Sequence, residues 1–288
     1  MPELPEVETT RRGLAPNAIG RTITSVEVHD GRLRWPVPPT LAAILTGRTL
    51  TGLDRRSKYL LFRCERGELA KADDRLSDHA GTLLVHMGMT GNLRWYSTAA
   101  AALPRRAHDH VDIRFENGAL LRYHDPRRFG AILWASDPVG RHPLLARLGP
   151  EPLEAGFNAQ TLHQALRSRT TAIKLALMDN HVVVGVGNIY ANEALFHAGI
   201  RPTRAANRVS LRRLGQLVES VRSTLTTAIA KGGSTLRDYV DSRGESGYFQ
   251  LDYFAYGRAG LPCRHCATPL KAIRQGGRAT TFCPRCQK

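Results

Sequence analysis

The spacing of apolar and polar residues in the first half of the chain is mostly that of β-strands. Short segments bounded by glycine or charged residues carry apolar side chains at every second position, as strands with one buried face do. Asn117-Gly118 lies between two such segments and predicts a type I′ hairpin turn. Many short strands favour a β-sandwich or a β-barrel. An amphipathic helix is expected over 2–14, and strands are expected over 23–28, 58–64, 82–86, 92–96, 111–115 and 121–123.

The spacing becomes helical in the second half of the chain. Ser210 is expected to cap a long helix with one apolar face, and Gly232-Gly233 is expected to end it. Between the two halves, residues 137–156 contain four prolines and three glycines with little periodicity, so we interpret them as a linker. Three shorter helices are expected over 158–167, 170–178 and 188–198.

These patterns predict an α+β protein with two domains and a small terminal segment. The expected parts are a strand-rich domain with a leading helix (2–136), the linker (137–156), a helical domain (157–250) and a cysteine-rich segment (251–288). Residues 65–80 and 97–107 interrupt the strand pattern and are expected to form surface loops.

The chain is strongly basic. Lysine and arginine total 41 against 25 acidic residues, which gives a formal net charge of +16. Such an excess favours a protein that contacts phosphates, and a basic surface kept for solubility is the alternative. Arginine dominates, which suits bidentate contacts to phosphates and base edges. No apolar run is long enough to span a membrane and no secretory signal is visible, so we expect a cytoplasmic protein that uses no membrane.

Four of the five cysteines are clustered near the carboxy terminus. Cys263-x2-Cys266 and Cys283-x2-Cys286 are separated by sixteen residues, which is the spacing of a four-thiolate zinc site. Four protein ligands leave no position for water, so the expected cofactor is one structural Zn²⁺; two disulfides or an iron site are the alternatives. The segment 257–288 has seven basic residues and no acidic residue, so it is expected to bind nucleic acid.

The amino terminus offers a nucleophile. Removal of Met1 would expose the secondary amine of Pro2, and α-amino groups have pKa values of ~8, so part of the amine is unprotonated at neutral pH. Such an amine can attack the C1′ atom of a sugar and form a Schiff base. Glu3 and Glu6 lie one helical turn apart beside it and suit acid–base work. The alternative is that the two glutamates only offset the helix dipole.

The first residues, PELPEVET at 2–9, closely resemble the amino terminus of formamidopyrimidine-DNA glycosylases. The resemblance runs along the whole chain, through Lys58, HMGMTG at 86–91, DPRRFG at 125–130, GVGNIYANE at 185–193 and the four-cysteine finger. It implies an amino-terminal β-sandwich, a helical domain with a helix–two-turn–helix motif, and a zinc-binding β-hairpin.

The resemblance also implies an activity. Members of this family excise oxidised purines, chiefly 8-oxoguanine and formamidopyrimidines, from double-stranded DNA, and then cleave the strand by β- and δ-elimination. We expect the chain to act as a monomer. The alternatives are a sister enzyme of the same fold that removes oxidised pyrimidines, and a non-catalytic zinc protein that binds lesions.

Residue roles follow from the same resemblance. The implied catalytic set is Pro2 as nucleophile and Glu3 as acid–base partner, with Lys58 and Arg278 beside them, and the implied supporting residues are Glu6 and Glu193, the latter orienting the amino-terminal region. His86, Asn188 and Arg278 would grip backbone phosphates, and Met89, Arg127 and Phe129 would fill the gap left by a flipped base.

Several of these residues also have structural interpretations. Lys58 is alternatively a solvated lysine at a strand end, His86 a strand histidine with satisfied hydrogen bonds, and Asn188 a helix cap. Met89 and Phe129 are alternatively core residues.

Two segments depart from the family pattern. Residues 65–80 lengthen a connection that is usually short, and their aspartates predict that it folds away from DNA. Residues 232–250 occupy the place of a lesion-capping loop, with Arg237, expected to contact DNA, where a lysine often lies.

Overall fold

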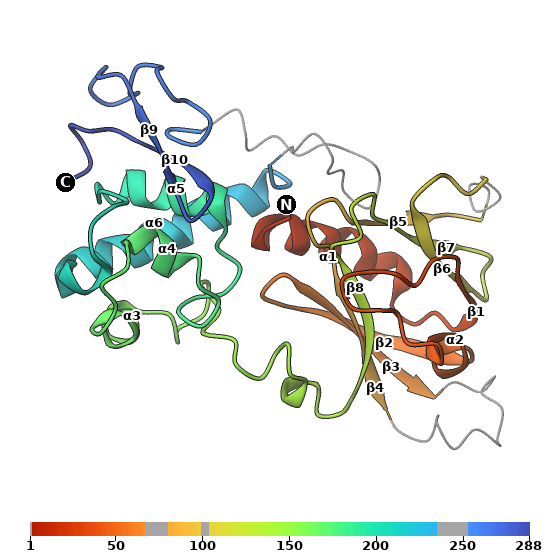
Figure 1. Cartoon of the computed structure of the whole chain (residues 1–288). Coiled ribbons are helices and arrows are strands. Elements are labelled where there is room, and N and C mark those ends of the chain that lie inside the picture. The colour runs from red at the N-terminus through yellow and green to blue at the C-terminus, as the bar shows by residue number, and fades with distance from the viewer. Residues whose placement is uncertain (1, 67–79, 99–103, 235–252) are drawn as a thin grey trace. The chain divides into compact units, whose positions relative to one another are not determined.

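The computed structural model describes residues 2–66, 80–98, 104–234 and 253–288 (Figure 1). Contacts divide the chain into two compact units. The first contains Met1–Ala146 and Gly232–Gly247, and the second contains Arg147–Lys231 and Tyr248–Lys288. A division by contacts does not test independent folding, so the domain boundaries expected from the sequence stay a prediction.

The first unit contains two antiparallel four-stranded sheets, ordered β1-β6-β7-β5 and β2-β3-β4-β8. Buried side chains from both sheets and from α1, among them Val26, Phe62, Val85 and Leu121, form one core cluster. Two separate sheets over a shared core make a β-sandwich and not a closed barrel. The strands are β1 (Ile23–Val28), β2 (Arg48–Arg56), β3 (Tyr59–Arg66), β4 (Gly81–His86), β5 (Asn92–Tyr96), β6 (Asp109–Phe115), β7 (Leu120–His124) and β8 (Ala131–Ser136).

The leading helix α1 (Leu4–Ala18) is longer than the predicted 2–14. Leu4, Val7 and Leu14 lie on its buried face as predicted. Burial of that face stabilises the helix, so the helix continues beyond Gly13. The sequence analysis missed β2, β8 and the short helix α2 (Leu41–Leu45). In β2 a register shift between Leu50 and Gly52 breaks the alternation that would have indicated a strand.

The hairpin between β6 and β7 forms where it was predicted, but its turn is not type I′. A type I′ turn needs positive φ at both central residues, and here Gly118 has φ 76° while Asn117 is not in the left-handed region. The Gly118 N–H donates to the Phe115 carbonyl at 2.9 Å, and the Phe115 N–H donates to the Ala119 carbonyl at 3.0 Å. This is a three-residue loop with glycine in the left-handed position.

The second unit is helical and ends in a two-stranded hairpin. Its central helix α5 is buried from Ile189 to Phe196 and packs against α6 and β10. Gly187 is the N-cap residue of α5. The helix predicted over 170–178 is shorter than expected and spans Ile173–Leu177. The elements are α3 (Ala159–Leu166), α4 (Ile173–Leu177), α5 (Asn188–His197), α6 (Leu211–Ala230), β9 (Lys271–Gln275) and β10 (Arg278–Phe282).

The predicted α+β class is therefore confirmed, with a leading helix, two sheets, a helical unit and a terminal hairpin. Within the described residues, no helix has the length and apolar character needed to cross a membrane.

Candidate catalytic and DNA-binding site

Pro2 is buried and leads directly into α1, whose N-cap residue is Glu3. The Glu3 side chain is 2% exposed and Glu6 is fully buried. The Glu6 carboxylate accepts a hydrogen bond from the Glu3 N–H at 2.8 Å, and two more from the Ser234 N–H at 2.8 Å and the Ser234 hydroxyl at 3.0 Å. Glu6 therefore does more than offset a helix dipole: it fixes the backbone next to Pro2.

Glu8 is a supporting residue that the sequence analysis missed. It accepts hydrogen bonds from Arg11 and Arg12 of the same helix and from Arg55 of β2. Burial alone raises the pKa of Glu8, but the hydrogen bonds from Arg11 and Arg12 outweigh it and hold the pKa below its ordinary value. Arg55 also donates to the Ser57 carbonyl at 3.0 Å, which ties α1 to the β2–β3 turn. The i, i+3 and i+4 spacing of the charges on α1 was a signal for these pairs.

Lys58 lies in the two-residue turn between β2 and β3, and not in the strand predicted for 58–64. Arg56 and Tyr59 are paired across the turn, and Ser57 has φ 57°. Lys58 is half-buried. Its charge lies close enough to His86 at the end of β4 to lower the pKa of that histidine. The structure thus brings together two residues that were predicted to contact phosphates.

His86 is held as a neutral ring with a defined tautomer. Desolvation by burial, with the charges of Lys58 and Arg34, lowers its pKa to about 4. Its Nδ1 atom accepts a hydrogen bond from the Gly88 N–H at 3.0 Å, so the ring proton must lie on Nε2. The Tyr59 ring packs against it with centroids 4.8 Å apart. A neutral donor fixed in this way suits a phosphate oxygen.

Met89, Arg127 and Phe129 lie on two neighbouring loops. One loop crosses from β4 in one sheet to β5 in the other, and the second crosses back from β7 to β8. Because β4 pairs with β8 and β5 pairs with β7, the topology places the two crossings side by side. Met89 is 37% and Phe129 42% exposed, so neither is a core residue. The Arg127 guanidinium lies 4.8 Å from the centre of the Phe129 ring.

Asp125 joins the two loops, a role the sequence analysis did not assign. Its fully buried carboxylate accepts hydrogen bonds from the Thr90 hydroxyl at 2.6 Å, the Gly130 N–H at 2.8 Å and the Tyr123 hydroxyl at 3.1 Å. A Cβ atom at Gly88 would overlap the backbone of the opposite loop, so glycine is required for this close approach. The exposed side chains are thus presented from a rigid base.

Asn188, in the second unit, is the first residue of α5 and not its N-cap. Its Oδ1 atom accepts a hydrogen bond from the Lys174 ammonium at 2.6 Å. The same ammonium donates to the Thr280 hydroxyl at 2.7 Å and the Ala279 carbonyl at 3.0 Å. Because an ammonium only donates, the Asn188 oxygen must face it, and the amide NH₂ group faces away. The sequence analysis missed Lys174, whose only signal was a charge inside the apolar segment of a short helix.

Glu193 is a buried carboxylate of α5 that contacts the segment before the cysteine finger. Its carboxylate, 1% exposed, accepts hydrogen bonds from the backbone N–H groups of Phe254, Ala255 and Tyr256 at 2.7 to 3.0 Å. Desolvation by burial is the largest effect and raises the pKa of Glu193. The residue therefore organises the segment before the cysteine finger, and its part in orienting the amino-terminal region stays a prediction.

The four cysteines Cys263, Cys266, Cys283 and Cys286 come together around one point, and their sulfurs all lie within 4.8 Å of one another. The Sγ atoms of Cys263 and Cys286 are 3.9 Å apart, and those of Cys266 and Cys283 are 3.5 Å apart. Zn–S bonds of ~2.3 Å in a tetrahedron separate sulfurs by about 3.8 Å, so the donor set fits one zinc ion.

Arg278 is exposed at the start of β10, directly after the Gly276-Gly277 turn. Arg237 and the other residues of the expected capping loop from 235 to 250 lie outside the described residues, as does most of the 65–80 insert. The predicted residues divide between the units. The first holds Pro2, Glu3, Glu6, Lys58, His86, Met89, Arg127 and Phe129, and the second holds Asn188, Glu193, Arg278 and the cysteines.

Comparisons with known proteins agree with this architecture. Residues 1–132 match the model of the formamidopyrimidine-DNA glycosylase N-terminal domain, 148–240 match the H2TH domain of the same proteins, and 260–288 match a zinc finger found in FPG and IleRS. Proteins named formamidopyrimidine-DNA glycosylase from Methylococcus capsulatus and Thiobacillus denitrificans are 52% and 54% identical to the chain, with the whole of each sequence covered.

Solved structures extend the comparison to DNA complexes. The MutM (FPG) protein of Thermus thermophilus superposes with a TM-score of 0.84 at 39% identity, covering 99% of this chain and 98% of that one. A variant of the Lactococcus lactis protein bound to Fapy-dG containing DNA gives 0.87 at 34% identity, with both chains fully covered.

The fold, the cysteine site and these DNA complexes define a zinc-finger DNA-repair enzyme. The chain belongs to the formamidopyrimidine-DNA glycosylase family, whose members are DNA glycosylases and abasic-site lyases.

Proposed function

We propose that this chain removes oxidised purines from double-stranded DNA through a Schiff base on Pro2. The observation that carries the proposal is the hydrogen bonding of Glu6, which fixes the backbone beside the Pro2 amine. With Met1 removed, that secondary amine attacks C1′ of the damaged nucleotide. The C1′–base bond breaks and its electrons leave with the base, which takes up a proton.

Glu3 is proposed to be the acid–base partner in this step. It is the residue next to the nucleophile and is 2% exposed. A carboxyl group kept away from bulk water is suited to proton transfer at the sugar. After the amine has lost its proton, the C1′–O4′ bond breaks and O4′ takes up a proton, which opens the sugar ring and leaves an iminium between C1′ and the Pro2 nitrogen. The iminium makes the C2′ protons acidic, so β-elimination of the 3′-phosphate and then δ-elimination of the 5′-phosphate follow.

Lys58, His86, Asn188 and Arg278 are proposed to bind phosphates of the damaged strand. Lys58 supplies a cation and His86 a neutral Nε2–H donor at one end of the sandwich. Asn188 offers its amide NH₂ and Arg278 an exposed guanidinium. Such contacts set the position of the DNA without reading its sequence.

Met89, Arg127 and Phe129 are proposed to occupy the space that the flipped nucleotide leaves. Two exposed apolar side chains beside an arginine suit this task, because the apolar groups replace lost stacking and the arginine can hydrogen-bond the unpaired base.

A second candidate substrate class is an oxidised pyrimidine. The wild-type Lactococcus lactis protein has been solved with oxidised pyrimidine containing DNA and superposes on this chain with a TM-score of 0.86 at 34% identity. Trapping with borohydride separates the candidates. We expect a covalent adduct with an 8-oxoguanine·C duplex at a higher rate than with a thymine glycol duplex. The reverse order would support the pyrimidine function, and no adduct with either duplex would support a non-catalytic lesion-binding protein.

We further propose that the protein acts as a monomer in the bacterial cytoplasm, where it binds chromosomal DNA. Its net charge of +16 supports a DNA-associated location. Analytical ultracentrifugation with a lesion duplex should show a 1:1 complex, and a 2:1 complex on one lesion would contradict the monomer.

A further inference from the structure

A pocket of about 450 Å³ lies in the second unit, between the last turns of α6 and the segment that leads into the cysteine finger. Among the described residues, its lining comes from α6, from His197 at the end of α5, and from Phe254 and Arg264. A volume of this size is typical of sites for small molecules. None of these side chains has a role in the proposed chemistry.

One wall of this pocket consists of flat side chains. The Arg264 guanidinium lies 5.1 Å from the centre of the Phe254 ring, and the centre of the His197 ring lies 4.7 Å from it in an edge-on arrangement. Partial desolvation, and then the charge of His265, lowers the pKa of His197, so the His197 ring is uncharged at neutral pH. Imidazole and guanidinium groups both stack on aromatic rings. This wall therefore suits a ligand with a flat aromatic group.

The same wall is held in place from behind. The Phe254 N–H donates to the Glu193 carboxylate at 2.8 Å, and the centre of the Phe254 ring lies 5.6 Å from that of Phe196. Phe196 belongs to the buried cluster that contains Cys263 and Cys283. Because the wall is fixed before a ligand arrives, little conformational entropy is lost when one binds.

On the α6 side, the pocket contains a buried hydroxyl group. Thr224 is 5% exposed, and within the described residues its Oγ1 atom has no hydrogen-bond partner. A threonine inside a helix often donates to the carbonyl four residues earlier. Here that carbonyl, of Ser220, already accepts from the Ser223 hydroxyl at 3.2 Å in addition to the helical N–H. The Thr224 hydroxyl is therefore left to bond with a ligand.

Two of the lining side chains are cations. Lys231 is the C-cap residue of α6, and Arg264 belongs to the first half of the cysteine finger. In the part of the chain that the structure describes, no acidic residue lines the pocket. The two full charges exceed the partial negative charge, about half a unit, at the carboxy end of a helix. The pocket therefore favours a ligand with a negative charge.

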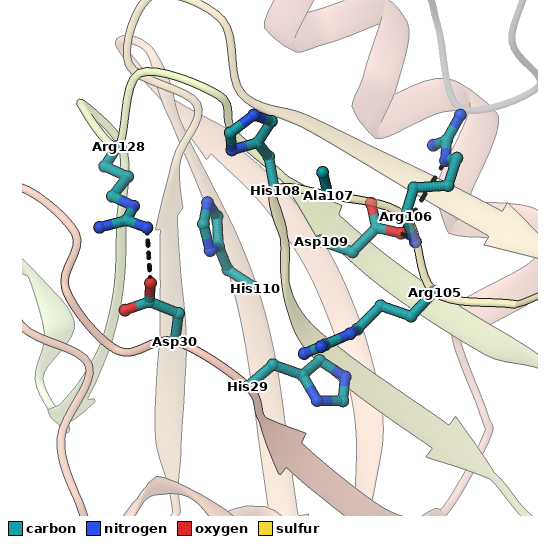
Figure 2. Close-up of a pocket in the computed structure, with 9 residues that line it drawn as sticks. All are labelled: His29, Asp30, Arg105, Arg106, Ala107, His108, Asp109, His110 and Arg128. Carbon is teal, nitrogen blue, oxygen red and sulfur yellow. Dashed lines mark hydrogen bonds and ion pairs between the residues drawn. The ribbon is translucent and has the colours of Figure 1, made fainter.

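The pocket beside the Asp125–Gly130 loop of the first unit has a different composition. Figure 2 shows Arg105, His110 and Arg128 around it, and no phenylalanine, tyrosine or tryptophan is among the described residues that line it. The pocket of the second unit adds aromatic surface to its cations. Its ligand should therefore carry a ring as well as a charge.

We propose that the pocket between α6 and the cysteine finger binds a small aromatic anion, a flat ring that carries one carboxylate or phosphate group. The ring lies against His197 and Arg264, and the anionic group pairs with the Lys231 ammonium. The Thr224 hydroxyl donates to an oxygen or nitrogen atom of the ligand. Aromatic carboxylates and nucleoside monophosphates share this chemistry.

The test is an NMR titration of the zinc-bound protein with two acids, naphthalene-2-carboxylate and adenosine 5′-monophosphate. Naphthalene-2-carboxamide and adenosine are their uncharged counterparts. We expect at least one acid to bind with a Kd below about 1 mM, with amide shifts concentrated at His197, Thr224 and Phe254. It should bind about 3-fold or more tightly than its uncharged counterpart, as one partly exposed ion pair provides. The acid with the lower Kd identifies the source of the ligand.

Thr224→Val keeps the shape of the side chain and removes its hydroxyl. The Tm of the ligand-free variant should equal or exceed that of the wild type, because no hydrogen bond of the free protein is lost. Its Kd for the acid should rise about 5-fold, as the loss of one hydrogen bond to a ligand predicts. Lys231→Met should abolish the preference for the acid over its uncharged counterpart. Thr226→Val is the matched control, because Thr226 is an exposed threonine of α6 that does not line the pocket.

Three results would overturn the proposal. Neither acid binds, or the shifts are concentrated at Lys58 and His86 instead, or Thr224→Val binds the acid with the Kd of the wild type. A lower Tm for Thr224→Val together with an unchanged Kd would show that the hydroxyl has only a structural role.

Discussion

Glu6 and Ser234 are hydrogen-bonded to each other across 228 positions of the sequence. The Ser234 N–H and hydroxyl both donate to one oxygen of the Glu6 carboxylate, and the Glu3 N–H donates to the other. The residues that follow α6 are thereby joined to the start of α1. Both carboxylate oxygens of Glu6 accept hydrogen bonds, and this fixes the backbone beside Pro2.

Glu6→Gln should impair the chemical step more than DNA binding. The substitution keeps the size of the side chain but turns one acceptor into a donor that faces N–H groups, which displaces the backbone next to Pro2. We expect the single-turnover rate of 8-oxoguanine excision to fall at least about 10-fold, while the Kd for the lesion duplex changes less than about 3-fold. Glu219→Gln, on an exposed part of α6, should leave both unchanged. An unchanged rate in Glu6→Gln would remove the positioning role.

The neutral state of His86 predicts a pH dependence of stability. Its pKa is about 4 in the folded protein, below the ordinary histidine value of 6.5. The unfolded chain therefore takes up a proton between these values while the folded protein does not, and stability falls as pH drops from 6.5 to about 4. His86→Gln removes this proton uptake, so its free energy of unfolding should depend less on pH in that window. Urea unfolding at several pH values measures the difference, and parallel curves for the two proteins would contradict the assignment.

Lys174→Met should destabilise the second unit and weaken DNA binding. The substitution keeps the length of the side chain but leaves the Asn188 amide, the Thr280 hydroxyl and the Ala279 carbonyl without their donor. Each buried group left unsatisfied costs about 1–3 kcal/mol. We expect a clear fall in Tm and a weaker complex with lesion DNA. Lys271→Met, at an exposed position of β9, is the control for loss of charge and should keep the wild-type Tm.

Removal of zinc should abolish DNA binding and leave the amino-terminal sandwich folded. The cysteine finger has a small core, so the ion supplies most of its folding free energy. Chelation should release one equivalent of zinc per chain and reduce the dispersion of the amide NMR signals of residues 260–288 to that of an unfolded peptide. A chelated protein that binds lesion duplex with unchanged affinity would show that the finger is not needed for recognition.

The sequence predicted the elements in which periodicity and turn residues agree. Strands β1, β5 and β6 and helix α5 were found within a few residues because their apolar positions alternate or repeat regularly. β2 was missed because its bulge at Leu50 and Gly52 disrupts alternation, and β8 because nothing in its short apolar run distinguishes a buried strand from other buried segments.

The sequence predicted those residues of the candidate site that belong to recognisable motifs. It did not predict roles that depend on contacts between residues far apart in the sequence. Exposure of Met89 and Phe129 follows from their glycine-bounded turns. The role of Glu193 did not follow, because its partners are about sixty residues further along the chain. Lys174 and Asp125 likewise act through partners that only the fold brings to them.

The covalent role of Pro2 is tested most directly by locating the borohydride-trapped adduct. Wild-type protein should be reduced in the presence of an 8-oxoguanine·C duplex, digested with nuclease and protease, and its amino-terminal peptide examined by mass spectrometry. The account predicts that the peptide begins at Pro2, without Met1, and carries the mass of a reduced sugar fragment on the Pro2 nitrogen. An adduct on a lysine such as Lys58, or on a peptide that retains Met1, would contradict it.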